Sequence, residues 1–174
     1  MDEGPAMQGR PGQVTERIAI FIDGSNLFYG ANQLGCEVDY RRLLVRLTQG
    51  RALLRAYFYT GVDPQNDKQR GFLLWLRHNG YRVMAKDLIT MPDQSKKANL
   101  EVEMAIDMIG LCGYCDTVVL LSGNGDLAYA LNQVSYKGVQ VEVVGLRSMV
   151  SESLLTVADR YTDLAEIRTE IQKP

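Results

Sequence analysis

Short apolar runs alternate with helical segments along almost the whole chain, and this alternation constrains the fold more than any other feature. Residues 18–22 are continuously apolar and end at Asp23-Gly24, a pattern typical of a strand buried on both faces. Further strands are predicted at residues 53–60, 81–85, 117–121 and 139–144, and residues 160–164 are a candidate edge strand. Helices are predicted at residues 25–34, 40–48, 98–112, 126–136 and 151–158, and between residues 64 and 80.

Strands that alternate with helices form a parallel sheet with right-handed crossovers and helices on both faces. We therefore predict an α/β fold, a single-domain three-layer α/β/α structure of the Rossmann-like kind, with a mainly parallel sheet of about five strands. The domain is predicted to span residues 17–167. Residues 1–16, which carry several glycines and prolines, are predicted to be a flexible N-terminal tail, and residues 168–174 a C-terminal tail.

The charge balance limits the partners of this chain. It has 19 Lys and Arg residues against 21 Asp and Glu residues and a formal net charge of −2, which excludes a protein that binds nucleic acid by bulk electrostatic attraction. A local basic patch stays compatible with these numbers. No stretch approaches the ~20 apolar residues of a membrane span, and the first residues lack the features of a signal peptide, so we expect a cytoplasmic protein without membrane contact.

Acidic residues lie where such a fold binds its ligands, at the carboxyl ends of strands beside the point where the strand order reverses. Asp23 follows the first predicted strand directly, and Asp126 follows the fourth after a short turn. If these two strands are neighbours, both carboxylates reach the same crevice. Glu101 lies in the first turn of the helix that precedes the fourth strand, near this edge, whereas Asp107 lies nearly two turns further away.

Carboxylates that converge repel each other, and a hard divalent cation relieves this repulsion. We therefore predict that Asp23, Glu101 and Asp126 hold Mg²⁺ or Mn²⁺ and catalyse hydrolysis of a phosphodiester. Neutral oxygen donors or positioning groups are predicted at Asn26, Ser122 and Asn124. Purely local roles stay open: Asp23 as a strand-end cap, Asp126 as the N-cap of its helix, and Glu103 with Asp107 as a solvated or salt-bridged face.

A second motif overlaps the turn that contains Asp126. Gly123-x-Gly125-x-x-Ala128 follows a strand and opens a helix, as the glycine-rich fingerprint of dinucleotide-binding proteins does, and Glu142 lies about 20 residues further on. However, the motif follows the fourth strand rather than the first, and the charge of Asp126 would repel a pyrophosphate. The nuclease interpretation is therefore favoured over a nucleotide cofactor.

A substrate with a phosphate backbone requires cations near the acidic site. Lys96 and Lys97 immediately precede the helix of Glu101 and are predicted to contact phosphates. Arg42 and Arg46 are interpreted as a solvated helix face. Among the aromatic residues, Tyr29 and Tyr59 have the form of base-stacking groups, but core packing is favoured for them as well as for Phe28, Phe72 and Trp75.

Three segments together resemble a known family: residues 22–26, residues 97–107 and residues 121–126. The sequence is similar to the NYN domain family of PIN-like nucleases, and especially to its LabA-like branch, from about Arg17 to Ile167. The resemblance implies a PIN-like α/β/α fold and metal-dependent ribonuclease chemistry on single-stranded RNA. It places the D-G-x-N motif of the family on Asp23 and Asn26, the acidic position of its K-G-x-D motif on Glu101, and a later helix aspartate on Asp107.

Two positions depart from the pattern of the family. Asn124 stands where the S-G-D-G-D motif usually has a carboxylate, and Glu101 replaces an aspartate. The LabA-like branch is also associated with regulation, including circadian output in cyanobacteria. The resemblance therefore implies two functions: a Mg²⁺- or Mn²⁺-dependent ribonuclease, or a catalytically weakened domain that regulates by binding RNA or protein. Protein partners and a homodimer are compatible with both.

Overall fold

The computed structural model describes residues 15–174, so nearly all of the predicted N-terminal tail lies outside the described residues. Its centre is a six-stranded sheet in the order β3-β2-β1-β6-β7-β8, in which every neighbouring pair is parallel. The strands are β1 (Arg17–Asp23), β2 (Ala52–Val62), β3 (Arg82–Asp87), β6 (Thr117–Leu121), β7 (Gln140–Gly145) and β8 (Arg160–Asp163). A two-stranded antiparallel hairpin, β4 (Ile89–Thr90) and β5 (Lys96–Lys97), lies apart from this sheet.

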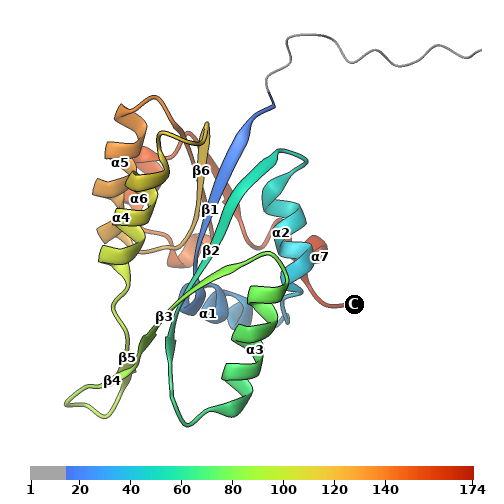
Figure 1. Cartoon of the computed structure of the whole chain (residues 1–174), viewed down its shortest axis with the longest axis vertical. Coiled ribbons are helices and arrows are strands. Elements are labelled where there is room, and N and C mark those ends of the chain that lie inside the picture. The colour runs from blue at the N-terminus through green and yellow to red at the C-terminus, as the bar shows by residue number, and fades with distance from the viewer. Residues whose placement is uncertain (1–14) are drawn as a thin grey trace, which may run out of the picture.

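Helices cover both faces of the sheet, so the predicted three-layer α/β/α fold is confirmed (Figure 1). One face is covered by α1 (Gly24–Leu34), α2 (Tyr40–Thr48), α3 (Asp67–His78) and α7 (Arg168–Ile171). The other face is covered by α4 (Glu101–Leu111), α5 (Ala128–Tyr136) and α6 (Glu152–Val157). Two short 3₁₀ turns, η1 (Gly125–Leu127) and η2 (Arg147–Met149), join strands to helices.

The central strand β1 explains why the core has two halves. Its side chains alternate between the faces, so Ile18, Ile20 and Ile22 enter one core and Ala19 and Phe21 enter the other. All five are fully buried, as the continuous apolar run predicts for a strand covered on both sides.

Several boundaries differ from the prediction. The sheet has six strands because residues 160–163 pair with β7 as a full edge strand. The connection between β3 and α4, for which no element was predicted, contains the β4–β5 hairpin. The residues predicted as a C-terminal tail form α7, where Ile171 is buried among the core residues beneath α2 and Gln172 bridges to Val38.

The start of α1 also differs, and this difference affects the site. The N-cap is Asp23, whose carboxylate accepts the backbone N–H of Asn26, so the helix begins at Gly24, one residue before the predicted start. A Cβ atom on Gly24 would lie 2.7 Å from the backbone oxygen of Tyr59. Glycine is therefore required for α1 to start this close to β2.

Three aromatic predictions are wrong. Phe28 and Tyr29, expected in the core, are exposed on α1, and Trp75 is partly exposed on α3 with the Arg41 guanidinium 5.5 Å from its ring centre. The predictions for Tyr59, which is buried, and for Phe72, which packs against the core, are confirmed. Among the helices of residues 15–174, none combines the length and the apolar character that a bilayer-spanning segment requires.

Candidate functional site

The strands β1 and β6 are neighbours at the centre of the sheet, and the strand order reverses between them. From β1 the chain proceeds outward through β2 and β3, and from β6 it proceeds in the opposite direction through β7 and β8. Because the two strands are parallel, their carboxyl ends, Asp23 and the turn that begins at Ser122, lie at the same edge. The point at which the sequence predicts ligand binding is therefore the centre of this edge.

Asp23 is held by donors from two directions. The Ser122 hydroxyl donates to its Oδ2 at 3.1 Å, and the Ser25 hydroxyl donates to its Oδ1 at 3.0 Å. The backbone N–H of Asn26 donates to the same Oδ1 at 3.3 Å. Asp23 is thus the N-cap of α1 and not only a strand-end cap, and it is also joined to the end of β6. The Ser25 contact was not predicted.

A chain of hydrogen bonds continues from Asp23 to Glu101. The backbone N–H of Asn124 donates to the Ser122 hydroxyl at 3.2 Å, and the Asn124 side-chain amide donates to Glu101 Oε1 at 2.9 Å. We call Asp23, Ser122, Asn124 and Glu101 the carboxylate network. The second carboxylate oxygen of Glu101 is buried and has no hydrogen-bond partner among residues 15–174. An unpartnered buried carboxylate oxygen is unfavourable unless a cation or a proton satisfies it.

Asn124 is oriented by a second contact. Its side-chain oxygen accepts the backbone N–H of Asp126 at 3.0 Å, which fixes the amide nitrogen toward Glu101. Asn124, not Asp126, is therefore the residue that caps the following turn, and the local interpretation of Asp126 as the cap is wrong. The Asp126 side chain is exposed, and within residues 15–174 its carboxylate forms no hydrogen bond or ion pair.

The other acidic residues of α4 have partners of their own. The Tyr59 hydroxyl donates to Asp107 Oδ2 at 2.7 Å, and burial, followed by this bond, raises the pKa of Tyr59 far above its usual value. Lys86 donates to Glu103 at 2.9 Å and lowers the pKa of that carboxyl, so Glu103 is the salt-bridged residue that the local interpretation describes. Asp107 follows Glu101 by six residues, about 9 Å along the helix axis. Asp107 therefore lies outside the carboxylate network.

The chemistry of the network suits a hard cation, although its geometry is not that of a closed metal site. Among residues 15–174, no group of three Asp, Glu, His or Cys side chains is arranged to hold a metal ion. Mg²⁺, however, is often bound by one or two carboxylates together with water and substrate phosphate. Asp23 and Glu101 supply two carboxylates, and one buried oxygen of Glu101 has no hydrogen-bond partner among residues 15–174. Metal binding at this site stays a prediction.

The lysines predicted to contact phosphates lie on the β4–β5 hairpin. Lys96 forms an ion pair with Asp63 at 3.1 Å, and the pKa of Asp63 is lowered by the backbone N–H of Gln65 and then by Lys96. Lys97 is exposed in β5 opposite Ile89. Both lysines lie a few residues before Glu101 in the chain, so the hairpin carries positive charge close to the start of α4.

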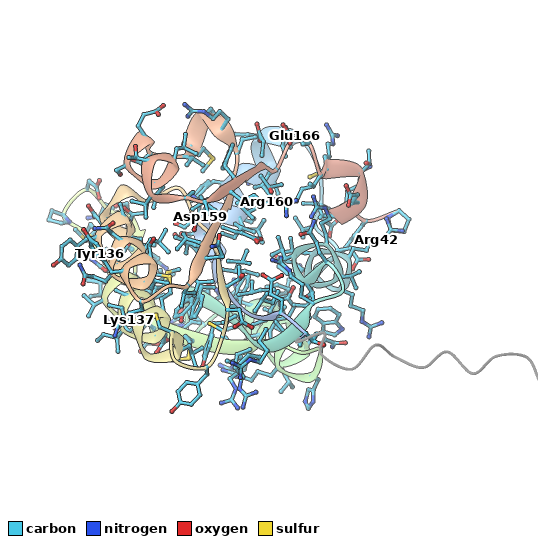
Figure 2. The ribbon with its side chains drawn as sticks, turned by 90° about the horizontal axis from the view of Figure 1, so that it is seen from above. Arg42, Tyr136, Lys137, Asp159, Arg160 and Glu166 are labelled. Atoms are coloured by element: carbon cyan, nitrogen blue, oxygen red, sulfur yellow. The ribbon has the colours of Figure 1, made fainter. Side chains whose placement is uncertain are left out.

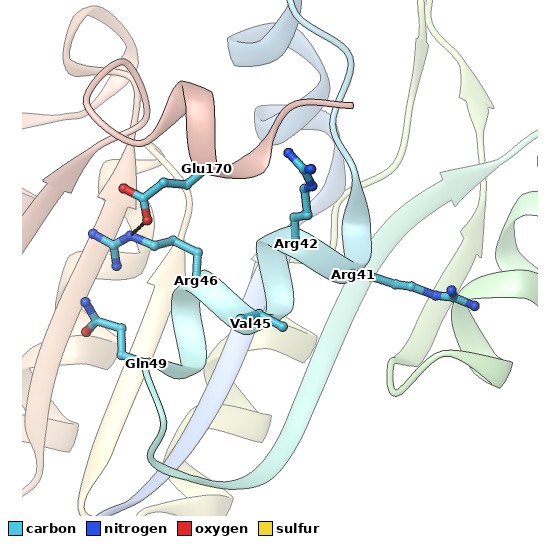
Figure 3. Close-up of a pocket in the computed structure, with 6 residues that line it drawn as sticks. All are labelled: Arg41, Arg42, Val45, Arg46, Gln49 and Glu170. Carbon is cyan, nitrogen blue, oxygen red and sulfur yellow. Dashed lines mark ion pairs between the residues drawn. The ribbon is translucent and has the colours of Figure 1, made fainter. Parts of the chain in front are cut away.

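The arginines of α2 have structural partners. A hollow of about 650 Å³ lies over this helix, lined by Arg41, Arg42, Val45, Arg46, Gln49 and Glu170 (Figure 3). Arg46 pairs with Glu170 of α7 at 2.8 Å, and Arg42 donates to the backbone oxygen of Gln172. Arg41 donates to Asn79 after α3. These contacts hold α2 to α3 and α7, so the interpretation of Arg42 and Arg46 as a freely solvated face is incomplete.

The contacts of Glu142 argue against a dinucleotide site. Arg51 binds both carboxylate oxygens of Glu142, at 2.7 and 3.1 Å. Glu142 is the third residue of β7, away from the carboxyl edge, so it cannot serve a ligand bound there. Close packing, and not a bound pyrophosphate, explains the glycine at position 123, because a Cβ atom there would lie 1.9 Å from the backbone oxygen of Met149.

Comparisons with known proteins agree with this architecture. The model of the NYN domain family matches residues 17–165. The "Low amplitude and bright protein LabA" of Synechococcus elongatus is 39% identical over 166 residues, which cover 90% of this chain and 88% of the cyanobacterial protein. The crystal structure of a protein of unknown function from Vibrio parahaemolyticus superposes with a TM-score of 0.79 at 27% identity, covering 96% of this chain and all of the other. The chain belongs to the NYN domain family.

Proposed function

We propose that this protein is a divalent-cation-dependent ribonuclease that hydrolyses phosphodiester bonds of single-stranded RNA. The observation that carries the proposal is the carboxylate network, in which Asp23 and Glu101 meet through Ser122 and Asn124 beside the strand-order reversal. The buried oxygen of Glu101 without a hydrogen-bond partner among residues 15–174 supports it, because a cation would satisfy this oxygen. Membership of a family of PIN-like nucleases supports the choice of chemistry.

Each residue of the network has a distinct role in this proposal. A bound Mg²⁺ or Mn²⁺ would polarise the phosphoryl oxygen and acidify the attacking water. Asp23 and Glu101 would hold the cation, and water and substrate phosphate would complete its coordination. Ser25 and Ser122 keep the Asp23 carboxylate in one orientation, and Asn26 fixes it through its backbone N–H. Orientation of this kind matters because the residues that orient a metal ligand affect activity, as the ligand itself does.

Local cations, and not the net charge, would bring the RNA to the site. A chain of net charge −2 does not attract a polyanion as a whole. Lys96 and Lys97 on the β4–β5 hairpin would contact backbone phosphates just before α4. Asp63 already engages Lys96, so Lys97 is the stronger candidate of the two.

The proposal is tested by cleavage of an end-labelled, unstructured RNA of about 20 nucleotides by the full-length protein. Cleavage is expected with Mn²⁺ or Mg²⁺ and not with EDTA, and the same RNA annealed to its complement should be cleaved more slowly. A protein that leaves the RNA intact at every cation concentration would contradict the proposal.

A regulatory role without catalysis is the second candidate, and Asn124 is the observation that favours it. In this chain an amide nitrogen occupies the position beside Glu101 at which a carboxylate would strengthen cation binding. The internal hydrogen bond keeps the two side chains together without any metal. A domain arranged in this way would bind RNA or a protein partner and leave the phosphodiester uncleaved.

The variant Asn124→Asp separates the two candidates through stability and metal binding. An aspartate cannot donate to Glu101, so two carboxylates would face each other at about hydrogen-bond distance. In EDTA at neutral pH we expect a loss of about 2 kcal/mol in the free energy of unfolding. The loss should shrink as the pH falls toward ~4. Repulsion raises the pKa of one of the two facing carboxyls in the folded variant, so the folded state binds more protons than the unfolded state and gains stability as the pH falls. Thermal melting over a pH series measures this.

Metal titration completes this test. Mn²⁺ should raise the melting temperature of Asn124→Asp more than that of the wild type, because a cation bound by the two carboxylates removes their repulsion in the folded state. The double variant Glu101→Gln, Asn124→Asp is the control, since it exchanges donor and acceptor and should regain most of the stability in EDTA. If Asn124→Asp alone cleaves RNA, the natural protein is the regulator. Equal melting of Asn124→Asp and the wild type in EDTA would contradict the contact between Asn124 and Glu101.

A further inference from the structure

Helix α1 presents two large aromatic side chains to solvent. Phe28 is 59% exposed and Tyr29 is 60% exposed, and their rings meet edge to face with centroids 5.6 Å apart. Neither ring enters the core, because α1 rests on the sheet through Gly24, Leu27, Gly30 and Ala31. Single exposed apolar residues are common on protein surfaces, but two adjacent rings in contact form a continuous apolar surface.

This aromatic pair lies beside the carboxylate network. Ser25, whose hydroxyl contacts Asp23, precedes Tyr29 by four residues and Phe28 by three, so the three side chains share one side of α1. Tyr29 is about 6 Å from Ser25 along the helix axis. Helical side chains lean toward the N-terminus of their helix, which for α1 is Asp23. The rings therefore lean toward the network.

Helix α1 is itself uncharged and is firmly anchored. Helix α1 contains no charged residue, so nothing on it repels a polyanion or selects a charged peptide. A Cβ atom on Gly30 would lie 3.2 Å from a methyl group of Leu164, which shows how closely α1 approaches the segment after β8. A fixed aromatic surface loses little conformational entropy when a ligand stacks on it.

We infer that Phe28 and Tyr29 form a stacking platform for an unpaired base of the RNA whose phosphate lies at Asp23 and Glu101. This inference rests on the proposed function, because the network defines where the phosphate lies. The stacking faces of bases in a duplex are covered by their neighbours, so the platform selects single strands. Every base has a stacking face, so the platform tolerates any sequence.

The test measures binding apart from cleavage. Fluorescence anisotropy with labelled 12-nucleotide oligo(U) and oligo(A) is recorded on the full-length protein in EDTA and with Ca²⁺ in place of Mg²⁺ or Mn²⁺. We expect Phe28→Ala, Tyr29→Ala to raise the dissociation constant about tenfold or more for both oligonucleotides. The ring-keeping variant Phe28→Tyr, Tyr29→Phe should bind like the wild type, and Phe28→Leu, Tyr29→Leu should not.

The matched control is Tyr136→Ala. Tyr136 is 79% exposed on α5, on the opposite side of the sheet from α1, and it projects outward (Figure 2). Its loss should leave the affinity for RNA unchanged. Molar masses of all variants are measured by light scattering.

The possible outcomes distinguish a failure of the stacking platform from a failure of the proposed catalysis. If Phe28→Ala, Tyr29→Ala binds RNA like the wild type, the platform is wrong, whatever the cleavage assay gives. If the wild type binds in a ring-dependent manner but never cleaves, the platform stands and the proposed catalysis fails. If the wild type binds no single-stranded RNA, both fail. A halved mass for the double alanine variant would identify the rings as a dimer contact and overturn the platform.

Discussion

Asp23→Asn is expected to abolish cation-dependent cleavage of single-stranded RNA and to leave the fold intact. Asparagine is as good an N-cap as aspartate, so α1 should still begin at Gly24. The Ser122 hydroxyl can accept from an amide as well as donate to a carboxylate, so this contact survives as well. Only the negative charge that would hold the cation is lost. Changes around metal ligands alone cost about 10- to 100-fold, so we expect a larger loss here, more than about 100-fold in rate.

The assay compares initial rates of RNA cleavage in Mn²⁺ with urea denaturation of the same preparations. The free energy of unfolding of Asp23→Asn should lie within about 1 kcal/mol of the wild type. Cleavage by Asp23→Asn at the wild-type rate would mean that the carboxylate network is not the catalytic site.

Asp107→Asn is the matched control, because it removes the same charge from a helix that also carries Glu101. Asp107 contacts Tyr59 and lies outside the network, so its amide should keep most of the activity. The resemblance to the family implies that Asp107 is a site residue, whereas its hydrogen bond to Tyr59 places it outside the carboxylate network. If Asp107→Asn loses as much activity as Asp23→Asn, the wider acidic set implied by the resemblance is correct.

The sequence predicted the layered fold because each strand is a local apolar run that can be recognised without its neighbours. It could not predict that β1 lies beside β6, since residues nearly 100 positions apart make that pairing. The shared position of Asp23 and the turn after Leu121 therefore stayed conditional until the strand order was known. The cap of α1 at Asp23 was missed because Asp, Ser and Asn are all good caps and follow one another closely.

The details of the site depend on contacts that spacing does not encode. Asn124 was predicted as a neutral oxygen donor, but its amide nitrogen faces Glu101, which is 23 residues away in the chain. Phe28 and Tyr29 were predicted to be buried because of their residue type. At 100° per residue they lie off the stripe of Leu27 and Ala31, so helical geometry contained the signal for their exposure.

Gly123→Ala is expected to destabilise the fold by about 3 kcal/mol or more. The added Cβ atom would lie 1.9 Å from the backbone oxygen of Met149 and 2.7 Å from its carbonyl carbon. Backbone atoms cannot rotate away, and the Gly123 oxygen is itself fixed by the N–H of Ser151 at 3.0 Å. The turn after β6 and the segment after β7 must therefore separate.

This separation should also disrupt the site, because Gly123 connects Ser122 to Asn124. A shift of the turn would break the hydrogen bonds that join Asp23 to Glu101, so the folded fraction of Gly123→Ala should bind Mn²⁺ and cleave RNA poorly. Gly125→Ala is the matched control, because its Cβ atom would meet the hydroxyl oxygens of Ser151 and Ser153, at 2.6 and 2.9 Å, which can rotate away. Its closest contact with an atom that cannot rotate away is the Ser151 Cβ atom at 3.0 Å, a much smaller overlap than that of Gly123→Ala. Urea denaturation should therefore give Gly125→Ala a higher midpoint than Gly123→Ala. Equal midpoints would mean that the segment around Met149 can move to accommodate the added Cβ atom. The geometry of the carboxylate network could then not depend on that segment.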